Sequence, residues 1–362
     1  MFEKRTNALT NRPELMGDCH DQSADWSRND SSIYVVNNNL SFCLRSLEGA
    51  RIFSPLQGQK RPALHRIARR YQLMKKPLFT GVCTALVTPF LNGSINYPLL
   101  ERLLLRQRDA GIEAVVVGGT TGEAATLTDE EKLALFRRAV EYAGDDLLII
   151  AGTGSNATDH AVTLSRAAQS LGADALLVVS PYYNKATPEG LFAHYSAIAA
   201  HVSIPIIVYN VPSRTGVDIP VSVYRQLSRL PNIAGVKEAS PDITKIAKIR
   251  AACPPEFSVW SGNDDMTVPV MALGGQGVIS VTSNLEPVRM QAMARAALAG
   301  DFDTAADLQL RLLPLMELLF CEVNPIPVKE AMALIGYDCG PCRLPLTPLS
   351  DPHRQALAEL LT

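Results

Sequence analysis

From residue 79 onward, hydrophobic and polar positions alternate in a regular pattern along the chain. Short hydrophobic runs rich in β-branched residues alternate with amphipathic stretches whose hydrophobic positions recur at helical spacing. The eight runs cover residues 82–87, 114–117, 147–151, 175–179, 204–209, 233–237, 257–260 and 278–281. They follow one another at roughly the spacing of one strand–helix unit, and eight such units close into a barrel. The pattern therefore predicts an α/β fold, a TIM (β/α)8 barrel.

Local signals mark the starts of two predicted helices. Thr128 stands three residues before Glu131, as in a capping box, and Pro188 follows Thr187 at the first position of another helical stretch. After residue 300 only helical pattern remains, at residues 310–319, 327–335 and 352–361. We therefore expect a catalytic barrel at residues 77–300 and a C-terminal helical region at residues 301–362.

Residues 1–76 lack this pattern. They show no sustained helical or strand period, and a basic cluster between Lys60 and Lys76 follows a part in which acidic residues are frequent. A transit peptide is poor in acidic residues and a signal peptide needs an apolar stretch, so neither fits. Two interpretations stay open: a disordered N-terminal extension, or a start assigned too far upstream, with Met74 as the natural first residue.

Composition narrows the class of function. Hydrophobic residues make up 47% of the 362 residues and charged residues 19%, which allows a sizeable core. Lys and Arg number 34 against 36 Asp and Glu, so the net charge of -2 creates no field that attracts nucleic acid or an anionic membrane. No apolar run approaches the ~20 residues that cross a bilayer. We expect a small-molecule substrate, and neither nucleic acid nor a membrane as a partner.

The cysteines point to a compartment. The chain has seven, an odd number, scattered over its length, which does not form a disulfide framework. A reducing environment is the simpler explanation, and we expect a cytoplasmic protein.

Polar residues follow several predicted strands. The chemistry of a TIM barrel lies where strands end and the following loops begin, so these residues are the first candidates for a site. They occupy residues 118–123 after the second strand, 180–184 after the fourth, 209–216 at the end of the fifth and 237–240 at the end of the sixth.

Lys237 is the leading catalytic candidate. The buried run at residues 233–236 places its amine inside the predicted barrel. Burial favours the uncharged form of a lysine amine, which attacks a ketone to form a Schiff base, and the Schiff base then acts as an electron sink. The alternative is a structural lysine that extends to solvent or pairs with a carboxylate.

A Schiff-base enzyme also needs groups that move protons. Tyr209, at the end of the preceding strand, supplies a phenol at the same height, and Thr121 with Tyr182 or Tyr183 extends the chain of hydroxyls. Each of these tyrosines taken alone is also explained as a packing residue.

Two further features suit carboxylates. The turn at residues 119–122 offers backbone N–H groups, and Arg214 offers a guanidinium beside Tyr209. An ordinary glycine-rich turn and a solvated arginine are the plainer interpretations of the same residues.

Taken together, these residues resemble the pyruvate-dependent class I aldolases of the N-acetylneuraminate lyase family. The resemblance covers residues 79–362 in order and at barrel spacing. Its motifs lie at residues 80–81, 85–90, 119–123, 151–154, 181–184, 209–216, 236–239, 274–280 and 324–329.

The resemblance implies the reaction. Pyruvate would form an imine on Lys237 and condense with L-aspartate 4-semialdehyde, a lyase-class step at the entry to lysine and diaminopimelate biosynthesis. Tyr209, Thr121 and Tyr183 would form the proton relay, with Tyr183 reaching in from a neighbouring subunit of a homotetramer, a dimer of dimers. The substrate-binding residues would be Thr120, Thr121, Arg214, Gly262 and Ile279. No metal or organic cofactor follows from the resemblance.

Other functions stay open within the same resemblance. Relatives that split sialic acid or ketodeoxy sugar acids share the lysine and the tyrosine but generally lack an arginine at the position of Arg214. A catalytically silent, pyruvate-binding regulatory homologue is the alternative from a different class, and the intact Lys237, Tyr209, Thr121 and Tyr183 argue against it.

Three motifs compete with this interpretation. Cys339-Gly340-Pro341-Cys342 has the spacing of a thioredoxin-type pair, but no predicted strand precedes it. Asp264 and Asp265 suggest a metal site, but no histidine lies near and a solvated helix start explains both acids. The histidines lack the spacing of a zinc motif.

The resemblance also bears on feedback by lysine. In sensitive family members lysine binds at a dimer cleft through a glutamate, histidines, an asparagine and a tyrosine. Asn156 and Tyr182 match, but the glutamate position falls on His160 and the histidine positions fall on Asp129 and Lys132. We therefore expect weak or no inhibition by lysine.

Overall fold

The computed structural model describes residues 77–361, and the statements below concern those residues. Residues 1–76, on which the two interpretations of the N-terminal segment fall, lie outside the described residues. Among residues 77–361, no helix has the length and hydrophobicity that a membrane span requires.

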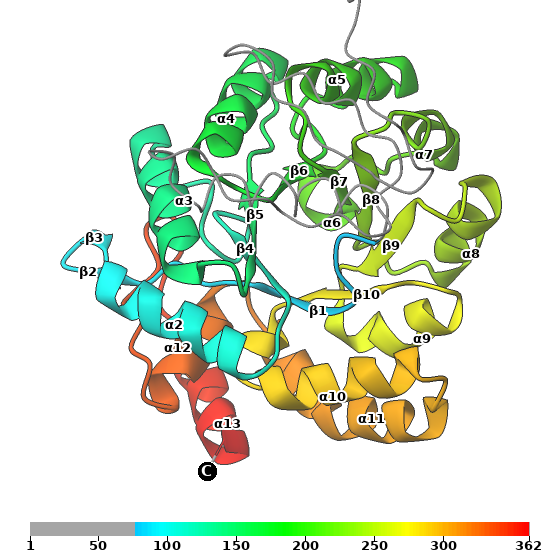
Figure 1. The fold of residues 1–362 in the computed structure, drawn as a ribbon. Coiled ribbons are helices and arrows are strands. Elements are labelled where there is room, and N and C mark those ends of the chain that lie inside the picture. The colour runs from blue at the N-terminus through cyan, green and yellow to red at the C-terminus, as the bar shows by residue number, and fades with distance from the viewer. Residues whose placement is uncertain (1–76, 362) are drawn as a thin grey trace, which may run out of the picture. The chain divides into compact units, whose positions relative to one another are not determined.

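Eight parallel strands close into a barrel (Figure 1). In chain order they are β1 (Gly81–Ala85), β4 (Ala114–Val117), β5 (Leu148–Gly152), β6 (Ala175–Val179), β7 (Ile206–Asn210), β8 (Ile233–Glu238), β9 (Ser258–Ser261) and β10 (Gly277–Ser280). Closure comes from β1, which pairs with both β4 and β10. Each predicted hydrophobic run overlaps one strand, so the TIM barrel is confirmed.

The helices surround the barrel in the order of the chain (Figure 1). They are α2 (Tyr97–Asp109), α3 (Asp129–Ala143), α4 (Thr158–Leu171), α5 (Pro188–His201), α6 (Pro212–Thr215), α7 (Val221–Leu227), α8 (Ile243–Ala252), α9 (Thr267–Ala272) and α10 (Pro287–Leu298). Smaller elements are the hairpin of β2 (Phe90–Leu91) with β3 (Ser94–Ile95), and the 3-10 turns η1 (Asp264–Met266) and η2 (Thr282–Asn284).

Both predicted helix starts are present. Thr128 Oγ1 accepts a hydrogen bond from the Glu131 N–H at 3.2 Å, and the Glu131 carboxylate accepts one from the Thr128 N–H at 3.0 Å, which completes the capping box of α3. Thr187 Oγ1 accepts from the Gly190 N–H at 3.2 Å, and Pro188 begins α5.

The C-terminal helices are α11 (Phe302–Leu318), α12 (Ile326–Leu334) and α13 (Asp351–Leu361). The helix expected at residues 310–319 begins earlier, because Asp301 caps it by accepting a hydrogen bond from the Thr304 N–H at 3.1 Å. Residues 302–308 contain only two large hydrophobic residues, Phe302 and Leu308, so the hydrophobic period is weak at the start of α11.

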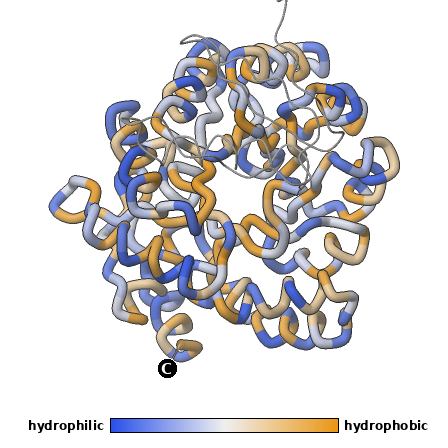
Figure 2. The backbone as a smooth tube through the Cα atoms, in the orientation of Figure 1, coloured by the Kyte–Doolittle hydropathy of each residue, from blue (hydrophilic) through white to orange (hydrophobic). Residues whose placement is uncertain are grey.

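The strands are buried on both faces, which explains their uninterrupted hydrophobic runs. In β4, Ala114 and Val116 belong to the core inside the barrel, whereas Val115 and Val117 pack in the layer between barrel and helices. Figure 2 shows hydrophobic residues along the strands around the centre of the barrel. Two cores therefore hold the strand ends, and everything attached to them, in fixed positions.

Candidate active site

A cavity of about 140 Å³ lies at the carboxyl ends of the barrel strands. Six of the predicted site residues line it: Thr120, Thr121, Tyr209, Arg214, Lys237 and Gly262. They come from loops and strands that are up to 142 residues apart in the sequence, from position 120 to position 262. The barrel therefore brings the predicted residues to one mouth.

Lys237 enters this cavity from the end of β8. Its side chain is buried, and its Nζ lies 4.5 Å from the centre of the Tyr209 ring. The two residues are also direct partners in the pairing of β7 with β8. The amine and the phenol that the sequence analysis paired are thus neighbours by strand register.

An irregularity in β8 decides which way Lys237 points. Ile206 pairs with Ile233, but Ile207 pairs with Gly235, so Ala234 is an extra residue in β8. Ile233 and Val236 both pack outside the barrel, which strict alternation does not allow for residues three apart. The bulge therefore turns Val236 outward and Lys237 inward.

Three lysines are buried among residues 77–361, and they differ in whether a carboxylate pairs with them. Lys329 Nζ lies 2.9 Å from the Glu123 carboxylate, and Lys245 forms ion pairs with Asp218 and Glu238. Within the described residues no carboxylate pairs with Lys237. The structural alternative of a charge-paired lysine therefore applies to Lys245 and Lys329 but not to Lys237.

The turn that carries Thr120 and Thr121 is fixed by a hydrogen bond from Thr88. Thr88 Oγ1 donates to the Gly122 carbonyl at 2.7 Å, and Glu123 adopts a left-handed backbone with φ of 57°. No described residue accepts a hydrogen bond from the backbone N–H of Thr120 or Thr121. Free N–H groups on a fixed turn can bind a carboxylate.

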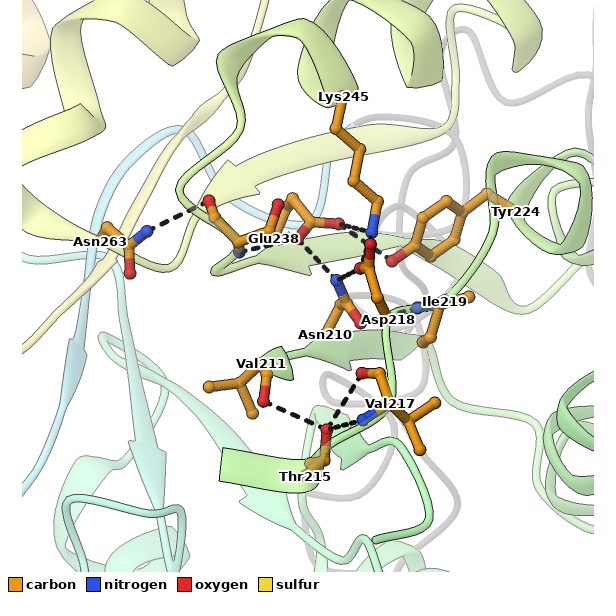
Figure 3. Close-up of polar contacts among 11 residues, drawn as sticks. Asn210, Val211, Thr215, Val217, Asp218, Ile219, Tyr224, Glu238, Lys245 and Asn263 are labelled. Atoms are coloured by element: carbon orange, nitrogen blue, oxygen red, sulfur yellow. Dashed lines mark hydrogen bonds and ion pairs between the residues drawn. The ribbon is translucent and has the colours of Figure 1, made fainter. Parts of the chain in front are cut away.

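Arg214 is exposed on α6 at the mouth of the cavity. Within the described residues its guanidinium has no hydrogen bond or ion pair. The segment around it is fixed by Thr215, whose Oγ1 bonds to the carbonyls of Val211 and Val217, each at 3.1 Å (Figure 3). A free guanidinium on an anchored segment is suited to a second carboxylate.

Behind the cavity, the outer sides of the same two strands share a set of buried polar contacts, which we call the Glu238 cluster: Glu238, Asn210, Asp218, Tyr224 and Lys245 (Figure 3). The Glu238 carboxylate accepts from Asn210 Nδ2 at 2.7 Å and from the Tyr224 hydroxyl at 3.0 Å. Burial, and then the neighbouring Glu238 charge, raise the pKa of Tyr224, so its hydroxyl keeps the proton that it donates. Asn210 and Glu238 directly follow Tyr209 and Lys237, so this cluster fixes β7 against β8.

The cluster also reaches the segment after α6. Asn210 Nδ2 donates to Asp218 at 2.9 Å, Asn210 Oδ1 accepts from the Ile219 N–H at 3.0 Å, and Lys245 pairs with Asp218. The segment that carries Arg214 is thereby tied to β7 and β8.

Two predicted residues do not line the cavity of the single chain. Ile279 is buried in β10, and Tyr183 is 87% exposed with a left-handed φ of 76°. The expectation for Tyr183 already places it against a neighbouring subunit.

Several residues that line the cavity were not predicted from the sequence, among them Asn263, Phe320 and Asn324. Phe320 and Asn324 follow α11 and come from the C-terminal helical region, which no strand-end rule covers. The motif at residues 324–329, one of those that carry the resemblance, is the sequence signal that includes Asn324.

The competing motifs have structural explanations. Burial raises the pKa of the Cys339 thiol to about 12 and that of Cys342 to about 11, so neither is the easily ionised thiol of a redox pair. The sequence predicted that Asp264 is a solvated acid at a helix start, and this was wrong. Asp264 is buried and accepts hydrogen bonds from the Val281 and Thr282 N–H groups. Desolvation raises the pKa of its carboxyl.

Within residues 77–361, no group of three or more His, Cys, Asp or Glu side chains is placed to hold a metal ion.

Comparison with known proteins agrees with the site. The sequence model of the dihydrodipicolinate synthetase family matches residues 78–362. A 4-hydroxy-tetrahydrodipicolinate synthase from Thermoanaerobacter sp. (strain X514) is 49% identical over 287 residues, which cover 79% of this chain and 97% of that protein.

Solved structures agree as well. A structure described as a monomeric dihydrodipicolinate synthase variant has a TM-score of 0.78 and 41% identity, and the match covers 80% of this chain and 97% of that one. The synthase from Cyanidioschyzon merolae with lysine bound has a TM-score of 0.77 and 40% identity, covering 78% of this chain and 97% of that one. The lyase activity implied by the resemblance is the one that these relatives carry, and the chain belongs to the dihydrodipicolinate synthetase family.

Proposed function

We propose that this enzyme condenses pyruvate with L-aspartate 4-semialdehyde through an imine on Lys237. The observation that carries the proposal is the position of Lys237, a buried amine without a carboxylate partner among the described residues, 4.5 Å from the Tyr209 ring centre in the cavity. Its counterparts Lys245 and Lys329 are ion-paired and lie outside this cavity.

The chemistry follows from the groups around the cavity. The Lys237 amine attacks the keto carbon of pyruvate, and loss of water leaves an imine between Nζ and that carbon. Removal of a proton from the methyl group gives an enamine, whose carbon attacks the aldehyde of the second substrate. The protonated imine accepts the electron pair that the methyl proton leaves behind, which is why a lysine is sufficient for this step. After the new carbon–carbon bond has formed, the amino group of the semialdehyde attacks the imine carbon and displaces the Lys237 amine, which frees the enzyme.

We assign proton transfer and the binding of substrate carboxylates to different groups. Tyr209 and Thr121 supply hydroxyls in the cavity, with Tyr183 of a neighbouring subunit as the third member of the relay. The free N–H groups of Thr120 and Thr121 suit the pyruvate carboxylate, and Arg214 suits the carboxylate of the semialdehyde. Gly262 lines the wall, and Ile279 supports it from β10.

The test is reduction of the imine with borohydride in the presence of pyruvate, followed by mass mapping. We expect one covalent adduct at Lys237, no adduct in Lys237→Ala, and none at the paired lysines Lys245 and Lys329, which serve as internal controls. An adduct on either of them in place of Lys237 contradicts the proposal.

Another aldolase of the same family is the second candidate. Arg214 favours the semialdehyde, because a guanidinium at the mouth can pair with the carboxylate of this second substrate. Relatives that split sialic acid or ketodeoxy sugar acids generally lack an arginine at this position. Turnover of sialic acid or a ketodeoxy sugar acid in preference to the semialdehyde would favour the second candidate.

The assembly and the compartment belong to the same proposal. A homotetramer made of two dimers supplies Tyr183 from one subunit to the next. A cytoplasmic location suits the five described cysteines, all of which are free thiols. We also propose that residues 77–300 form the catalytic barrel, with residues 301–362 completing its cavity.

A further inference from the structure

Asn324 joins the C-terminal helical region to the proton relay. It follows α11, lines the cavity, and is buried at 5% exposure. Its Nδ2 lies 3.0 Å from Thr121 Oγ1 and donates to it. Asn324 is thus in direct contact with one of the hydroxyls to which the proposed function assigns proton transfer.

The contact is supported by a second one, because α12 also binds the turn at residues 119–123. Lys329, five residues after Asn324, pairs with Glu123, two residues after Thr121, at 2.9 Å. The second Glu123 oxygen accepts from the Arg343 N–H at 2.9 Å. Both side chains of the ion pair are at most 3% exposed, so the pair is shielded from solvent. These contacts therefore hold the backbone that carries Asn324 against the turn that carries Thr121.

The direction of this hydrogen bond decides where the Thr121 proton goes. A threonine hydroxyl has one proton and can also accept. Because Oγ1 accepts from Asn324, its own proton is left for another acceptor in the cavity. An acceptor at position 324 would instead take that proton out of the relay.

The other half of the amide supports a functional role. Asn324 Oδ1 is buried, and no described residue donates a hydrogen bond to it. A buried acceptor without a protein donor disfavours folding, so stability alone does not explain an amide at this position.

We propose that Asn324 is a positioning residue that orients the Thr121 hydroxyl, so that its proton points into the relay. The proposal rests on the proposed function, because it assigns Asn324 a role through Thr121.

The test replaces the donor by an acceptor of the same shape. Asn324→Asp carries a carboxylate, which accepts only while it is ionised. We expect kcat to fall by about 10- to 100-fold at neutral pH with KM little changed. Relative to the wild type, its kcat recovers as pH falls and the carboxyl group becomes a donor again. The charged or titratable groups around the cavity and its turn are Lys237, Tyr209, Arg214, Glu123 and Lys329.

Asn324→Ala is the matched control. It can neither donate nor titrate, so we expect a loss of kcat of similar size whose ratio to the wild type does not recover at low pH. It also serves as the informative variant if Asn324→Asp folds poorly, as judged by melting temperature and by borohydride trapping of the pyruvate imine.

A double-mutant cycle with Thr121→Val separates this role from a simple charge effect. If Asn324 acts through Thr121, Asn324→Asp costs little further activity in the Thr121→Val background. Full additivity overturns the proposal, and so does an Asn324→Asp enzyme with wild-type kcat at neutral pH. A wild-type enzyme that forms no imine at Lys237 overturns the proposed function itself, and this inference with it.

Discussion

Arg214 is the residue whose role is most separable from that of Lys237. It lies at the cavity mouth on α6, and its guanidinium has no partner among the described residues. Lys237, whose amine forms the imine in the proposed reaction, lies on a different element, β8. The two side chains therefore serve different substrates in the proposed reaction.

We predict that Arg214→Ala weakens use of the semialdehyde and spares imine formation. Loss of a charge-assisted pair corresponds to about 1.5–3 kcal/mol, or a loss of about tenfold or more in kcat/KM for the semialdehyde. Steady-state kinetics and borohydride trapping with pyruvate measure the two steps. Arg225→Ala, an exposed arginine on α7 outside the cavity, is the control. Equal losses in both steps would contradict the assignment.

At the same scale, sequence and structure agree where a strand end gives the signal. Lys237, Tyr209 and Thr121 follow hydrophobic runs, so their place at the mouth could be predicted. The inward direction of Lys237 was predicted as well, but its physical cause was not visible in the sequence: it depends on the extra residue Ala234, and a bulge leaves no mark in a hydrophobic run. Asn324 was not predicted as a site residue because it belongs to the turn between α11 and α12, which is distant in sequence from every barrel strand.

At the scale of elements, the Glu238 cluster holds β7, β8, α7 and α8 around one buried carboxylate (Figure 3). Its members differ in exposure. The Glu238 side chain is fully buried, whereas that of Asp218 is 57% exposed. A carboxylate therefore contributes differently to the free energy of unfolding at the two positions.

We predict unequal losses of stability when each carboxylate is removed. Glu238→Ala leaves the buried Tyr224 hydroxyl without its acceptor and leaves Asn210 and Lys245 with only the exposed Asp218 as acceptor. We expect a loss of about 3–5 kcal/mol in unfolding free energy. Asp218→Ala removes a largely exposed partner, for which we expect about 1 kcal/mol or less. Urea unfolding measures both. A larger loss for Asp218→Ala than for Glu238→Ala would show that the segment after α6, and not the buried carboxylate, organises the cluster.

The strand order and helix sequence were predictable because each element has its own hydrophobic period. The beginning of α11 was not, because residues 302–308 contain only two large hydrophobic residues, Phe302 and Leu308, and the start is fixed by the Asp301 cap. Nor could the docking of α12 on the 119–123 turn be derived, since Lys329 and Glu123 are 206 residues apart and have no shared pattern.

For the whole molecule, the question is whether one chain is a complete enzyme. Tyr183 is 87% exposed and holds a left-handed backbone, which strains a bulky residue. Strain at an exposed aromatic side chain indicates a functional constraint on its position. A partner subunit that receives Tyr183 provides one.

We predict that activity depends on assembly. Dilution to monomers is expected to lower kcat, and Tyr183→Phe is expected to lower kcat of the assembled enzyme by about 100-fold through loss of the relay hydroxyl. Sedimentation velocity coupled to an activity assay over a concentration range measures the first, and steady-state kinetics the second. Tyr182→Phe, at the neighbouring exposed position, is the control. A monomer with full activity contradicts the prediction.

The last feature of the whole molecule is its response to lysine. The residues at the positions expected to contact lysine are His160, Asp129, Lys132, Asn156 and Tyr182. His160 Nε2 lies 2.8 Å from one Asp129 oxygen, and Lys132 Nζ lies 3.7 Å from the other. The Asp129 carboxylate, which contacts the side chain at the lost glutamate position, therefore already has two partners and is poorly placed to receive a ligand ammonium.

We predict weak or no inhibition by lysine. Without a free carboxylate at position 160, an ammonium ligand loses a charge-assisted hydrogen bond of about 1.5–3 kcal/mol, which is about a tenfold or greater loss of affinity. The comparison is a triple variant, Asp129→His, Lys132→His and His160→Glu, which removes the competing pair and restores the carboxylate. We expect its half-inhibition concentration to fall by about tenfold or more relative to the parent. Half inhibition of the parent enzyme well below millimolar lysine would show that Asp129 releases its partners to bind the ligand.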